Sequence, residues 1–461
     1  MADIHLVVLA AGKGTRMKSA LPKVLHRLAG RRMLDWVLDA GRRLAPASTT
    51  IVVGHQADRL RAEYADRPEI RFVVQEQQLG TGHALLQTQA LLAGATGTVL
   101  LLYGDVPLLT ARTLETLAAQ HQAEGAAATV VTALVARPYG YGRILRSDGH
   151  IARIVEERDA TDEQRAIREI NGGIYAFALE PLFGAIRSIA SRNVQGEYYL
   201  PDLIAVYRRR KLPVSTLTVG DPNEIKGINS RSELAEVTSI VRQRRNDELM
   251  AAGVTLVDPA TTYIDADVQV GADTVIHPNV YLEGRTVIGA ACEVHAGVRI
   301  VDSTIGDRVT IRNFCVITDS AIEAGATIGP FAHLRPGNQV GEGAHIGNFV
   351  ELKKTSFGAG SKAGHLAYLG DATIGEQVNV GAGVITCNYD GTRKHPTVVR
   401  DGAFVGSDSQ LVAPVTIGRD AYVAAGSTIV SDVPDGALGI ARGRQENKPG
   451  WAEQRGQPKQ G

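Results

Sequence analysis

The second half of the sequence repeats an aliphatic residue at nearly every sixth position. A six-residue period fits neither an α-helix nor a two-faced strand, but it suits a triangular coil in which each side turns one aliphatic side chain inward. Chance spacing among ordinary strands is the alternative, and period-two strands would not keep this spacing for so long. The sequence therefore predicts a parallel β-helix of hexapeptide repeats. Its expected inward residues are Ile264, Val270, Ile276, Leu282, Ile288, Val294, Ile300, Ile305, Ile311, Ile317, Ile322, Ile328, Leu334, Val340, Ile346, Leu352, Ile374, Val380, Val405, Leu411, Ile417, Val423 and Ile429.

Two stretches break the six-residue spacing, namely Lys353 to Asp371 and Cys387 to Gly402. Interruptions of a solenoid usually become loops on one face, so we expect chemistry at these two places. Three hexads make one coil. At roughly 4.8 Å per strand layer, some nine or ten coils would form a prism about 45 Å long.

The first half of the chain has a different hydrophobicity pattern, in which short apolar runs alternate with amphipathic stretches. This alternation is the βαβ pattern of a Rossmann-like α/β domain with a mostly parallel sheet. A helical spacing of apolar residues follows from residue 230 to 250. We therefore expect an α/β domain over residues 1–229, a linker helix over 230–250, and a β-helix domain over 251–461 whose polar end after Trp451 is disordered. The strands expected with most support are Ile4–Leu9, Thr50–Val53, Thr98–Tyr103 and Ala128–Leu134.

Composition excludes several classes of protein. The 49 Lys and Arg balance the 49 Asp and Glu, so no overall field attracts nucleic acid or an anionic membrane. Three cysteines without a CxxC pair indicate neither a disulfide framework nor a cysteine zinc site. The N-terminal residues lack the features of a signal peptide or a membrane span. We expect a cytoplasmic protein.

The string LAAGKGTRM, Leu9 to Met17, follows the first expected strand and precedes Pro22 and Lys23. Its glycines let backbone N–H groups approach an anion closely, and Arg16 and Lys23 would supply positive charge. A bare GxG after a strand is also common in tight turns, but the full string is more specific. Asp105 ends another expected strand, where either a Mg²⁺ ligand or a turn residue before a proline would fit.

These features resemble the sugar-1-phosphate nucleotidyltransferases, whose signature is LAAGxGTRM followed by PK. The resemblance implies that Mg²⁺ lies on Asp105 and Asn229, that Arg16 and Lys23 are catalytic, and that UTP is the nucleotide donor. One departure is Gly172, where Thr or Ser is expected, and we expect it to loosen the sugar pocket. The implied nucleotide and sugar residues are Leu9, Ala10, Ala11, Gly12, Lys23, Gln75, Gly80, Thr81, Tyr103, Gly104, Asp105, Gly142, Glu156, Asn171, Glu197 and Asn229.

Three segments of the second half, residues 331–337, 347–371 and 385–395, extend the resemblance over nearly the whole chain. Together with the first half they are similar to the bifunctional N-acetylglucosamine-1-phosphate uridyltransferase/glucosamine-1-phosphate acetyltransferase family. The resemblance implies a left-handed β-helix that acetylates glucosamine 1-phosphate with acetyl-CoA. The product, N-acetylglucosamine 1-phosphate, would then receive a uridylyl group from UTP at the first domain, with release of pyrophosphate.

His365 is the expected general base of the acetyl transfer, because the sugar amine must lose a proton and an imidazole titrates near neutral pH. A lone loop histidine would more often be only hydrogen bonded, but this one lies between Lys353 and Tyr368. Small side chains on the outside of the β-helix would let the slender arm of acetyl-CoA lie along it. Arg442, Arg444 and Lys448 are either a clamp for the phosphates of acetyl-CoA or a solvated basic tail. The resemblance implies that the acceptor lies on Arg335, Lys353, Tyr368 and Asn379, and acetyl-CoA on Ala382, Asn388, Tyr389, Ser407, Ala425 and Arg442.

Members of this family are homotrimers, so the resemblance implies a trimer, and a prism with an exposed apolar face also needs partners. Two other functions fit parts of the sequence. One is a single-activity nucleotidyltransferase with a regulatory β-helix, and the other is a non-catalytic scaffold. Neither would require the residue cluster around His365.

Overall fold

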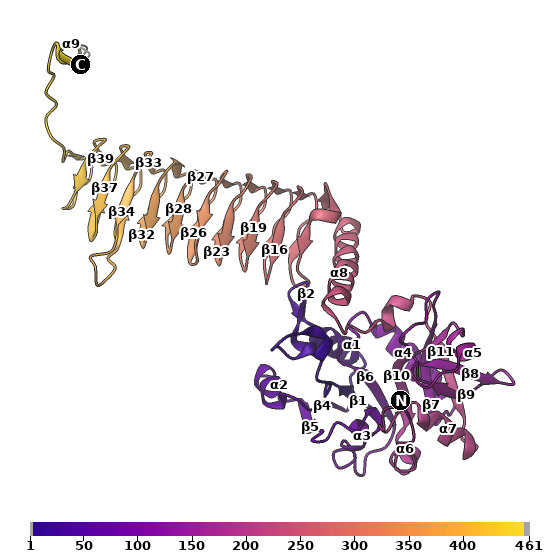
Figure 1. Cartoon of the computed structure of the whole chain (residues 1–461). Coiled ribbons are helices and arrows are strands. Elements are labelled where there is room, and N and C mark those ends of the chain that lie inside the picture. The colour runs from indigo at the N-terminus through magenta and orange to yellow at the C-terminus, as the bar shows by residue number, and fades with distance from the viewer. Residues whose placement is uncertain (1–2, 456–461) are drawn as a thin grey trace, which may run out of the picture. The chain divides into compact units, whose positions relative to one another are not determined.

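The computed structural model describes residues 3–455, and the chain divides between Val241 and Arg242 into two units (Figure 1). The first unit is built on a nine-stranded sheet with the order β11-β7-β10-β6-β1-β4-β5 and a β8-β9 hairpin beside β10. Only β10 runs antiparallel to its neighbours β6 and β7 on the main path. The strands are β1 (Ile4–Leu9), β4 (Ser48–Val53), β5 (Ile70–Val74), β6 (Thr98–Tyr103), β7 (Ala128–Leu134), β8 (Arg143–Ser147), β9 (His150–Val155), β10 (Glu169–Ala178) and β11 (Val214–Thr218).

Both faces of this sheet are covered by helices, which explains why strands such as β1 read as continuous apolar runs. Val7 and Leu9 pack in one core with α3 (Thr81–Leu86), α6 (Leu179–Ile186) and α7 (Asp202–Arg209). Leu6 and Val8 pack in the other core with α1 (Met33–Arg42), α2 (Ala57–Glu63) and α4 (Ala111–Ala123). The predicted mostly parallel α/β fold is confirmed.

The remaining elements of this unit are short. They are η1 (Thr15–Met17), η2 (Lys23–Leu25), the hairpin β2 (Arg27–Leu28) and β3 (Arg31–Arg32), α5 (Asp162–Arg165) and η3 (Pro222–Ile225). Helix α8 (Arg231–Ala251) then crosses the boundary between the units.

The second unit is a β-helix whose three faces are parallel sheets of eleven, ten and nine strands. Face one comprises β12 (Thr255–Leu256), β15 (Val275–Ile276), β18 (Glu293–Val294), β21 (Thr310–Ile311), β24 (Thr327–Ile328), β27 (His345–Asn348), β30 (Lys362–His365), β33 (Asn379–Val380), β36 (Phe404–Val405), β39 (Tyr422–Val423) and β41 (Leu438–Gly439). Face two comprises β13 (Tyr263–Ile264), β16 (Tyr281–Glu283), β19 (Arg299–Val301), β22 (Val316–Thr318), β25 (His333–Leu334), β28 (Glu351–Lys353), β31 (Tyr368–Gly370), β34 (Ile385–Cys387), β37 (Gln410–Val412) and β40 (Thr428–Ile429). Face three comprises β14 (Gln269–Val270), β17 (Val287–Ile288), β20 (Thr304–Ile305), β23 (Ser320–Ile322), β26 (Asn338–Val340), β29 (Ser356–Phe357), β32 (Ala372–Ile374), β35 (Thr397–Val399) and β38 (Val415–Ile417).

The predicted inward positions form one continuous core along this unit, with Val270 only partly buried. Most neighbouring coils pair residues 17 or 18 positions apart, as between Ile300 and Ile317, and the coils on either side of residues 388–396 pair residues 25 apart. The predicted left-handed β-helix of hexapeptide repeats is confirmed. Short pieces η4 (Pro259–Thr261) and α9 (Trp451–Arg455) flank it. The stretch after Trp451, which was expected to be disordered, continues α9 to Arg455, and its remainder, residues 456–461, lies outside the described residues.

The first expected interruption, Lys353 to Asp371, is wrong. The coil continues through this stretch, because Phe357, Ala363 and Leu369 fill the three inward positions and are fully buried. The spacing of large aliphatic residues is broken here because a phenylalanine and an alanine occupy two of the inward positions. The second interruption is present but shorter than expected, since the chain leaves the β-helix after β34 ends at Cys387 and returns to it where β35 begins at Thr397.

Within residues 3–455, no helix combines the length and the apolar character needed to span a membrane.

Candidate active sites

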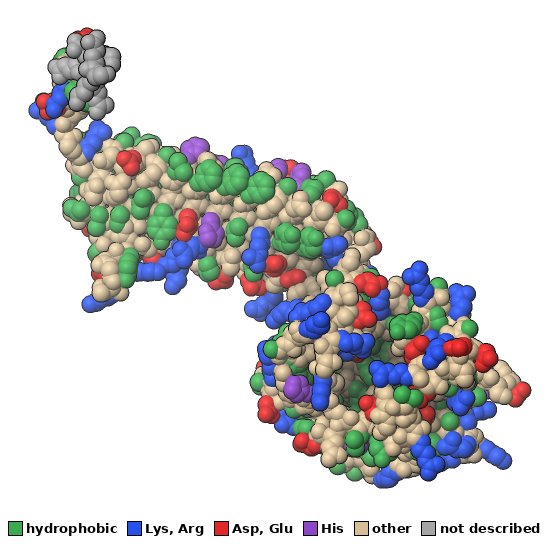
Figure 2. All heavy atoms as spheres, viewed as in Figure 1, with side chains coloured by type: hydrophobic (Ala, Val, Ile, Leu, Met, Phe, Trp, Pro, Cys, Tyr) green, Lys and Arg blue, Asp and Glu red, His purple; other side chains and the backbone are tan. Residues whose placement is uncertain are grey.

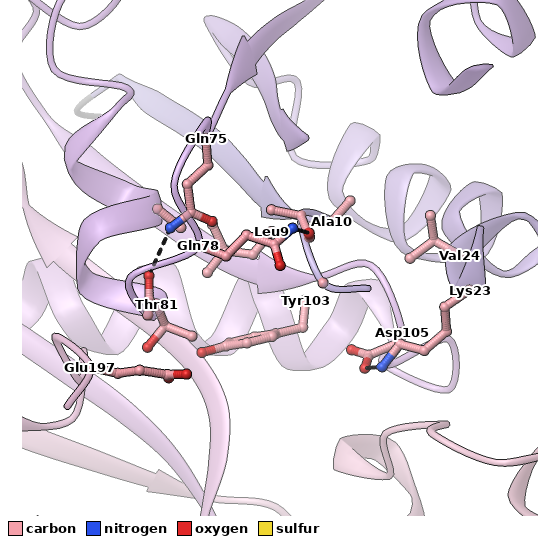
Figure 3. Close-up of a pocket in the computed structure, with 14 residues that line it drawn as sticks. Leu9, Ala10, Lys23, Val24, Gln75, Gln78, Thr81, Tyr103, Asp105 and Glu197 are labelled. Carbon is pink, nitrogen blue, oxygen red and sulfur yellow. Dashed lines mark hydrogen bonds and ion pairs between the residues drawn. The ribbon is translucent and has the colours of Figure 1, made fainter. Parts of the chain in front are cut away.

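A cleft opens in the first unit at the carboxyl ends of its parallel strands, where ligands of such sheets bind. Its first part is a cavity of about 300 Å³ (Figure 3). A second cavity of about 330 Å³ shares Thr81, Tyr103 and Glu197 with the first, so the two form one elongated cleft. The first cavity is lined by Leu9, Ala10, Ala11, Gly12, Lys23, Val24, Gln75, Gln78, Gly80, Thr81, Ala84, Tyr103, Asp105 and Glu197.

Two glutamine side chains shape the end of the first cavity. The amide of the buried Gln75 donates to the Gly80 carbonyl at 3.0 Å, and the amide of Gln78 donates to the Ala11 carbonyl at 2.7 Å. Gly80 has a φ of +105°, and a Cβ there would lie 2.8 Å from the Tyr198 carbonyl oxygen. Glycine is therefore required at this position. Gln78 was not predicted, although it fixes the backbone of the predicted LAAG segment.

Lys23, Asp105 and Asn229 meet at one edge of the cleft. The Lys23 ammonium forms an ion pair with Asp105 (Figure 3). It also donates to the Asn229 side-chain oxygen at 2.9 Å. A backbone hydrogen bond of 2.9 Å from Ile228 N–H to the Asp105 carbonyl brings the two segments together. Glu233 accepts from the Asn229 N–H at 2.6 Å, which holds Asn229 at the start of α8. Two oxygens from distant segments thus converge on one cation.

The second cavity is polar and contains predicted sugar residues, including Glu156 and Asn171. Asn171 donates to the Tyr175 hydroxyl at 2.7 Å and accepts from the Gly173 N–H at 3.1 Å. Burial raises the pKa of Glu156 to about 7, and repulsion from Asp159 and Asp202 adds to this effect. Glu156 can therefore hold a proton near neutral pH.

Gly142 and Gly172 lie beside this cavity. A Cβ on Gly142 would be 3.1 Å from a Glu156 carboxylate oxygen. A Cβ on Gly172 would be 2.8 Å from the Val131 carbonyl oxygen and 3.0 Å from Ile225, so this position faces packed protein. The expectation that Gly172 loosens the sugar pocket is wrong, because its missing side chain would point into the interior.

Some predicted residues lie outside the described cavities. Arg16 is exposed on η1 and lines neither cavity. Gly104 donates its N–H to the Leu9 carbonyl at 3.0 Å, which holds two strand ends together. It lines neither cavity. Asn229 also lies beyond both linings, and it reaches the cleft through Lys23.

In the second unit, His365 ends β30 and is exposed at the edge between faces one and two. Its Nδ1 is hydrogen bonded to the side-chain oxygen of Asn348, which lies beside it one coil earlier. Because an amide oxygen only accepts, this contact favours the neutral tautomer that has its hydrogen on Nδ1 and its lone pair on Nε2. Asn348 was not predicted, and it sets the tautomer that a base requires.

The predicted acetyl-CoA residues follow His365 along the same edge. Backbone hydrogen bonds from Asp408 to Ala382 and from Gly426 to Ser407 place successive coils in line. Arg442 then donates to the Ala425 carbonyl at 3.0 Å. Four predicted residues, Ala382, Ser407, Ala425 and Arg442, thus form one column on the outer wall.

A charged cluster lies at the other end of the face-two strands, where the chain turns toward face three. The Lys353 ammonium is 3.5 Å from the Asp371 carboxylate, to which the Asn388 amide donates at 2.6 Å. Lys394 lies beside Lys353, and the nearness of this second ammonium group lowers the pKa of Lys394. Lys394 was not predicted. It belongs to the short excursion between β34 and β35, whose presence the sequence did indicate.

The other predicted acceptor and acetyl-CoA residues belong neither to this column nor to the charged cluster. Arg335 is exposed and forms a 3.1 Å ion pair with Glu351. The Tyr368 hydroxyl and the Asn388 amide both lie beside Gly370, which has no side chain and so leaves room for them. Asn379 is half-buried on β33, and Tyr389 is exposed on the excursion.

An apolar ladder runs along the edge next to His365. The rings of Phe314, Phe331 and Phe349 stack with centroids 5.3 Å apart, and Leu366 follows in the next coil. These four side chains are 55%, 47%, 54% and 62% exposed. Figure 2 shows apolar side chains gathered in rows on the visible wall of this unit.

The comparisons with known proteins agree with this architecture. Residues 6–188 match the family model of MobA-like NTP transferase domains, residues 259–336 that of GMPPB C-terminal domains, and residues 396–431 that of bacterial transferase hexapeptides. The fold, the sites and these matches define a nucleotidyltransferase domain followed by a hexapeptide-repeat transferase domain.

Whole-chain relatives narrow this class. The bifunctional protein GlmU of Trichlorobacter lovleyi is 53% identical over 452 residues, 98% of either chain. The GlmU proteins of Pelobacter propionicus and Geobacter metallireducens are 50% and 49% identical, again over 98% of either chain. The chain therefore belongs to the bifunctional GlmU family and has uridyltransferase and acetyltransferase activities. The single-activity and scaffold alternatives are wrong, because the match covers both domains.

Proposed function

We propose that residues 1–229 bind UTP and N-acetylglucosamine 1-phosphate in the cleft and join them, with residues 230–250 linking this domain to the acetyltransferase of residues 251–461. The uracil end would lie against Gln75, Gly80 and Thr81, and the sugar in the second cavity near Glu156 and Asn171. The observation that best supports this arrangement is the continuity of the two cavities, which share Tyr103 and Glu197.

The reaction needs alignment more than a base. A phosphate monoester with a second pKa of about 6 is largely dianionic at neutral pH, so its oxygen can attack the α-phosphorus of UTP directly. A new P–O bond forms as the bond to pyrophosphate breaks. Lys23 would neutralise charge on the phosphates, and the exposed Arg16 would meet the departing pyrophosphate.

We assign a Mg²⁺ site to Asp105 and Asn229. A carboxylate and an amide oxygen are hard ligands, and both are directed at one ammonium nitrogen, that of Lys23. The donor set therefore fits the ion. When bound, Mg²⁺ would offset negative charge on the phosphate oxygens. Glu233 and the Ile228 N–H would hold the two ligands in place.

For the acetyl transfer, the phosphate of glucosamine 1-phosphate would lie at Arg335, Lys353 and Lys394, with Tyr368 and Asn379 at the sugar. Acetyl-CoA would run along the column from Ala382 to Arg442, with its thioester near Asn388 and Tyr389. The amine nitrogen attacks the thioester carbon and His365 Nε2 takes the amine proton. The C–S bond then breaks, and the departing CoA thiolate takes a proton back from the imidazolium, so that CoA leaves as the thiol.

The exposed column and apolar ladder support assembly as a homotrimer, in which a neighbouring chain would cover the acetyl-CoA edge. We place the enzyme in the cytoplasm, where its cysteines Cys292, Cys315 and Cys387 would stay reduced.

One experiment tests the two-activity assignment. The protein is mixed with glucosamine 1-phosphate, acetyl-CoA, UTP and Mg²⁺, and free thiol and pyrophosphate are followed separately. We expect thiol release first, and pyrophosphate only after N-acetylglucosamine 1-phosphate has formed. Omission of acetyl-CoA should abolish both products, and addition of N-acetylglucosamine 1-phosphate should restore pyrophosphate alone. Pyrophosphate release at full rate from glucosamine 1-phosphate without acetyl-CoA would contradict the proposal.

A further inference from the structure

Two histidines and a glutamate cluster on face one of the β-helix, in coils that precede both acetyl-transfer clusters. His277 and His295 are 18 residues apart, which is the length of one coil of three hexads. Their rings therefore stack, with centroids 4.9 Å apart and planes within 7° of each other. Glu293 lies on β18, two residues before His295.

The three side chains direct their ligand atoms toward one another. The Nε2 atoms of His277 and His295 are 3.3 and 3.5 Å from the same Glu293 carboxylate oxygen. All three ligand atoms lie within 4.8 Å of one another. Two ligands bound at about 2.0–2.1 Å to a tetrahedral centre lie roughly 3.3–3.4 Å apart. The two nitrogen–oxygen distances match edges of a tetrahedral metal site, and a turn of the nearly parallel rings would bring both Nε2 lone pairs to one ion.

The scaffold beneath the cluster is rigid. His277 and His295 follow the fully buried Ile276 and Val294, which pair with each other across adjacent strands. Side chains on packed strands keep their geometry better than side chains on loops. The cluster is also half-exposed, so an ion and completing water molecules could reach it from solvent.

We propose that His277, Glu293 and His295 bind a first-row divalent ion, with Zn²⁺ as the best fit. Two imidazole nitrogens and one carboxylate oxygen are a recurrent protein ligand set for Zn²⁺, whereas Mg²⁺ prefers oxygen ligands alone. The ion joins two successive coils and leaves a fourth position for water. The site is separate from the proposed Mg²⁺ site at Asp105 and Asn229.

The test uses the full chain without a histidine tag, stripped of metal with a chelator and kept in excess Mg²⁺. Zn²⁺ is titrated calorimetrically, and Co²⁺ serves as a spectroscopic probe. We expect one equivalent of Zn²⁺ per chain, and for Co²⁺ the strong visible absorption of a four-coordinate ion. His277→Ala and His295→Ala should each weaken Zn²⁺ binding at least about tenfold.

His150→Ala is the matched control, since it removes an exposed histidine of the other unit and should leave Zn²⁺ binding unchanged. Glu293→Gln tests the site without removing a ring, and it should also weaken binding while circular dichroism shows an intact fold. The proposal is overturned if wild-type protein binds no Zn²⁺, if the histidine variants bind as tightly as wild type, or if Co²⁺ shows thiolate charge-transfer bands.

Discussion

The two candidate active sites are built in opposite ways. In the first unit, strand ends and loops bring together residues far apart in sequence, such as Lys23, Gln75 and Asp105, around a cleft. In the second unit, a repeat stacks residues one coil apart along an exposed wall, as with Asn348 and His365. The cleft is formed within one chain, whereas an exposed column needs another surface or the substrate to exclude water. The first site should therefore work within one chain, and the second should depend on assembly.

The largest expected effect is at the cleft of the first unit. Asp105→Ala removes a carboxylate that meets Lys23 and, by our proposal, Mg²⁺, so pyrophosphate release should fall about 10³-fold or more. Thiol release from acetyl-CoA should not change. Asp148→Ala, which removes an exposed carboxylate of the same unit, is the control. Near-normal uridylyl transfer by Asp105→Ala would refute this assignment.

At the exposed site, His365→Ala should lower thiol release by about 10²-fold or more, because it removes the proposed general base. Pyrophosphate release from supplied N-acetylglucosamine 1-phosphate should stay at the wild-type rate. Asn348→Ala should give a smaller loss of the same activity, since the ring stays but its Nδ1 partner is gone. Equal loss of both activities in His365→Ala would show that the two sites are not separate.

Assembly can be tested through the apolar ladder. Phe331→Asp places a charge in the middle of the stacked rings and should dissociate the proposed trimer, as measured by analytical ultracentrifugation. Acetyl transfer should fall at least about tenfold while uridylyl transfer persists. A Phe331→Asp protein that sediments as wild type and acetylates normally would argue against a covered edge.

A smaller effect is expected for Lys394, which lies beside Lys353. Lys394→Ala should raise the KM for glucosamine 1-phosphate about tenfold and leave kcat nearly unchanged, because it removes charge that binds phosphate equally in ground and transition states. Lys354→Ala, one residue from Lys353, is the control. An unchanged KM would remove Lys394 from the acceptor site.

The smallest expected effect is on stability. Burial raises the pKa of Glu156 to about 7 from 4.5, so the native chain holds a proton that the unfolded chain releases between these pH values. This group therefore makes stability fall as pH rises from about 4.5 to 7, by roughly 1–3 kcal/mol. Glu156→Gln should unfold at a higher temperature than wild type at pH 8 and at a similar one at pH 4. The reverse order at pH 8 would contradict the assigned shift.

The repeat made the β-helix the more predictable fold, because each aliphatic position reports the same local environment. The prediction failed where the environment stayed the same but the residue type changed, at Phe357 and Ala363. Individual contacts were harder to predict. Gln78 acts through a hydrogen bond to a partner 67 residues away, which no local pattern marks. Asn348 lies one coil before His365, but the sequence spacing predicted an interruption at this place.

Family motifs supplied the candidate residues of the cleft, but only the fold shows how they are arranged. The packing of Gly172 against the Val131 carbonyl, for example, depends on the pairing of β7 with β10. Likewise, the role of Glu233 in holding Asn229 follows from the start of α8.

A crystal structure of the wild-type protein with UDP-N-acetylglucosamine, Mg²⁺ and CoA would test the account most directly. We predict the nucleotide against Gln75 and Thr81, the sugar beside Glu156, and CoA along the column from Ala382 to Arg442. Binding of CoA away from that column, or of the nucleotide outside the joined cavities, would contradict the assignment of the two sites.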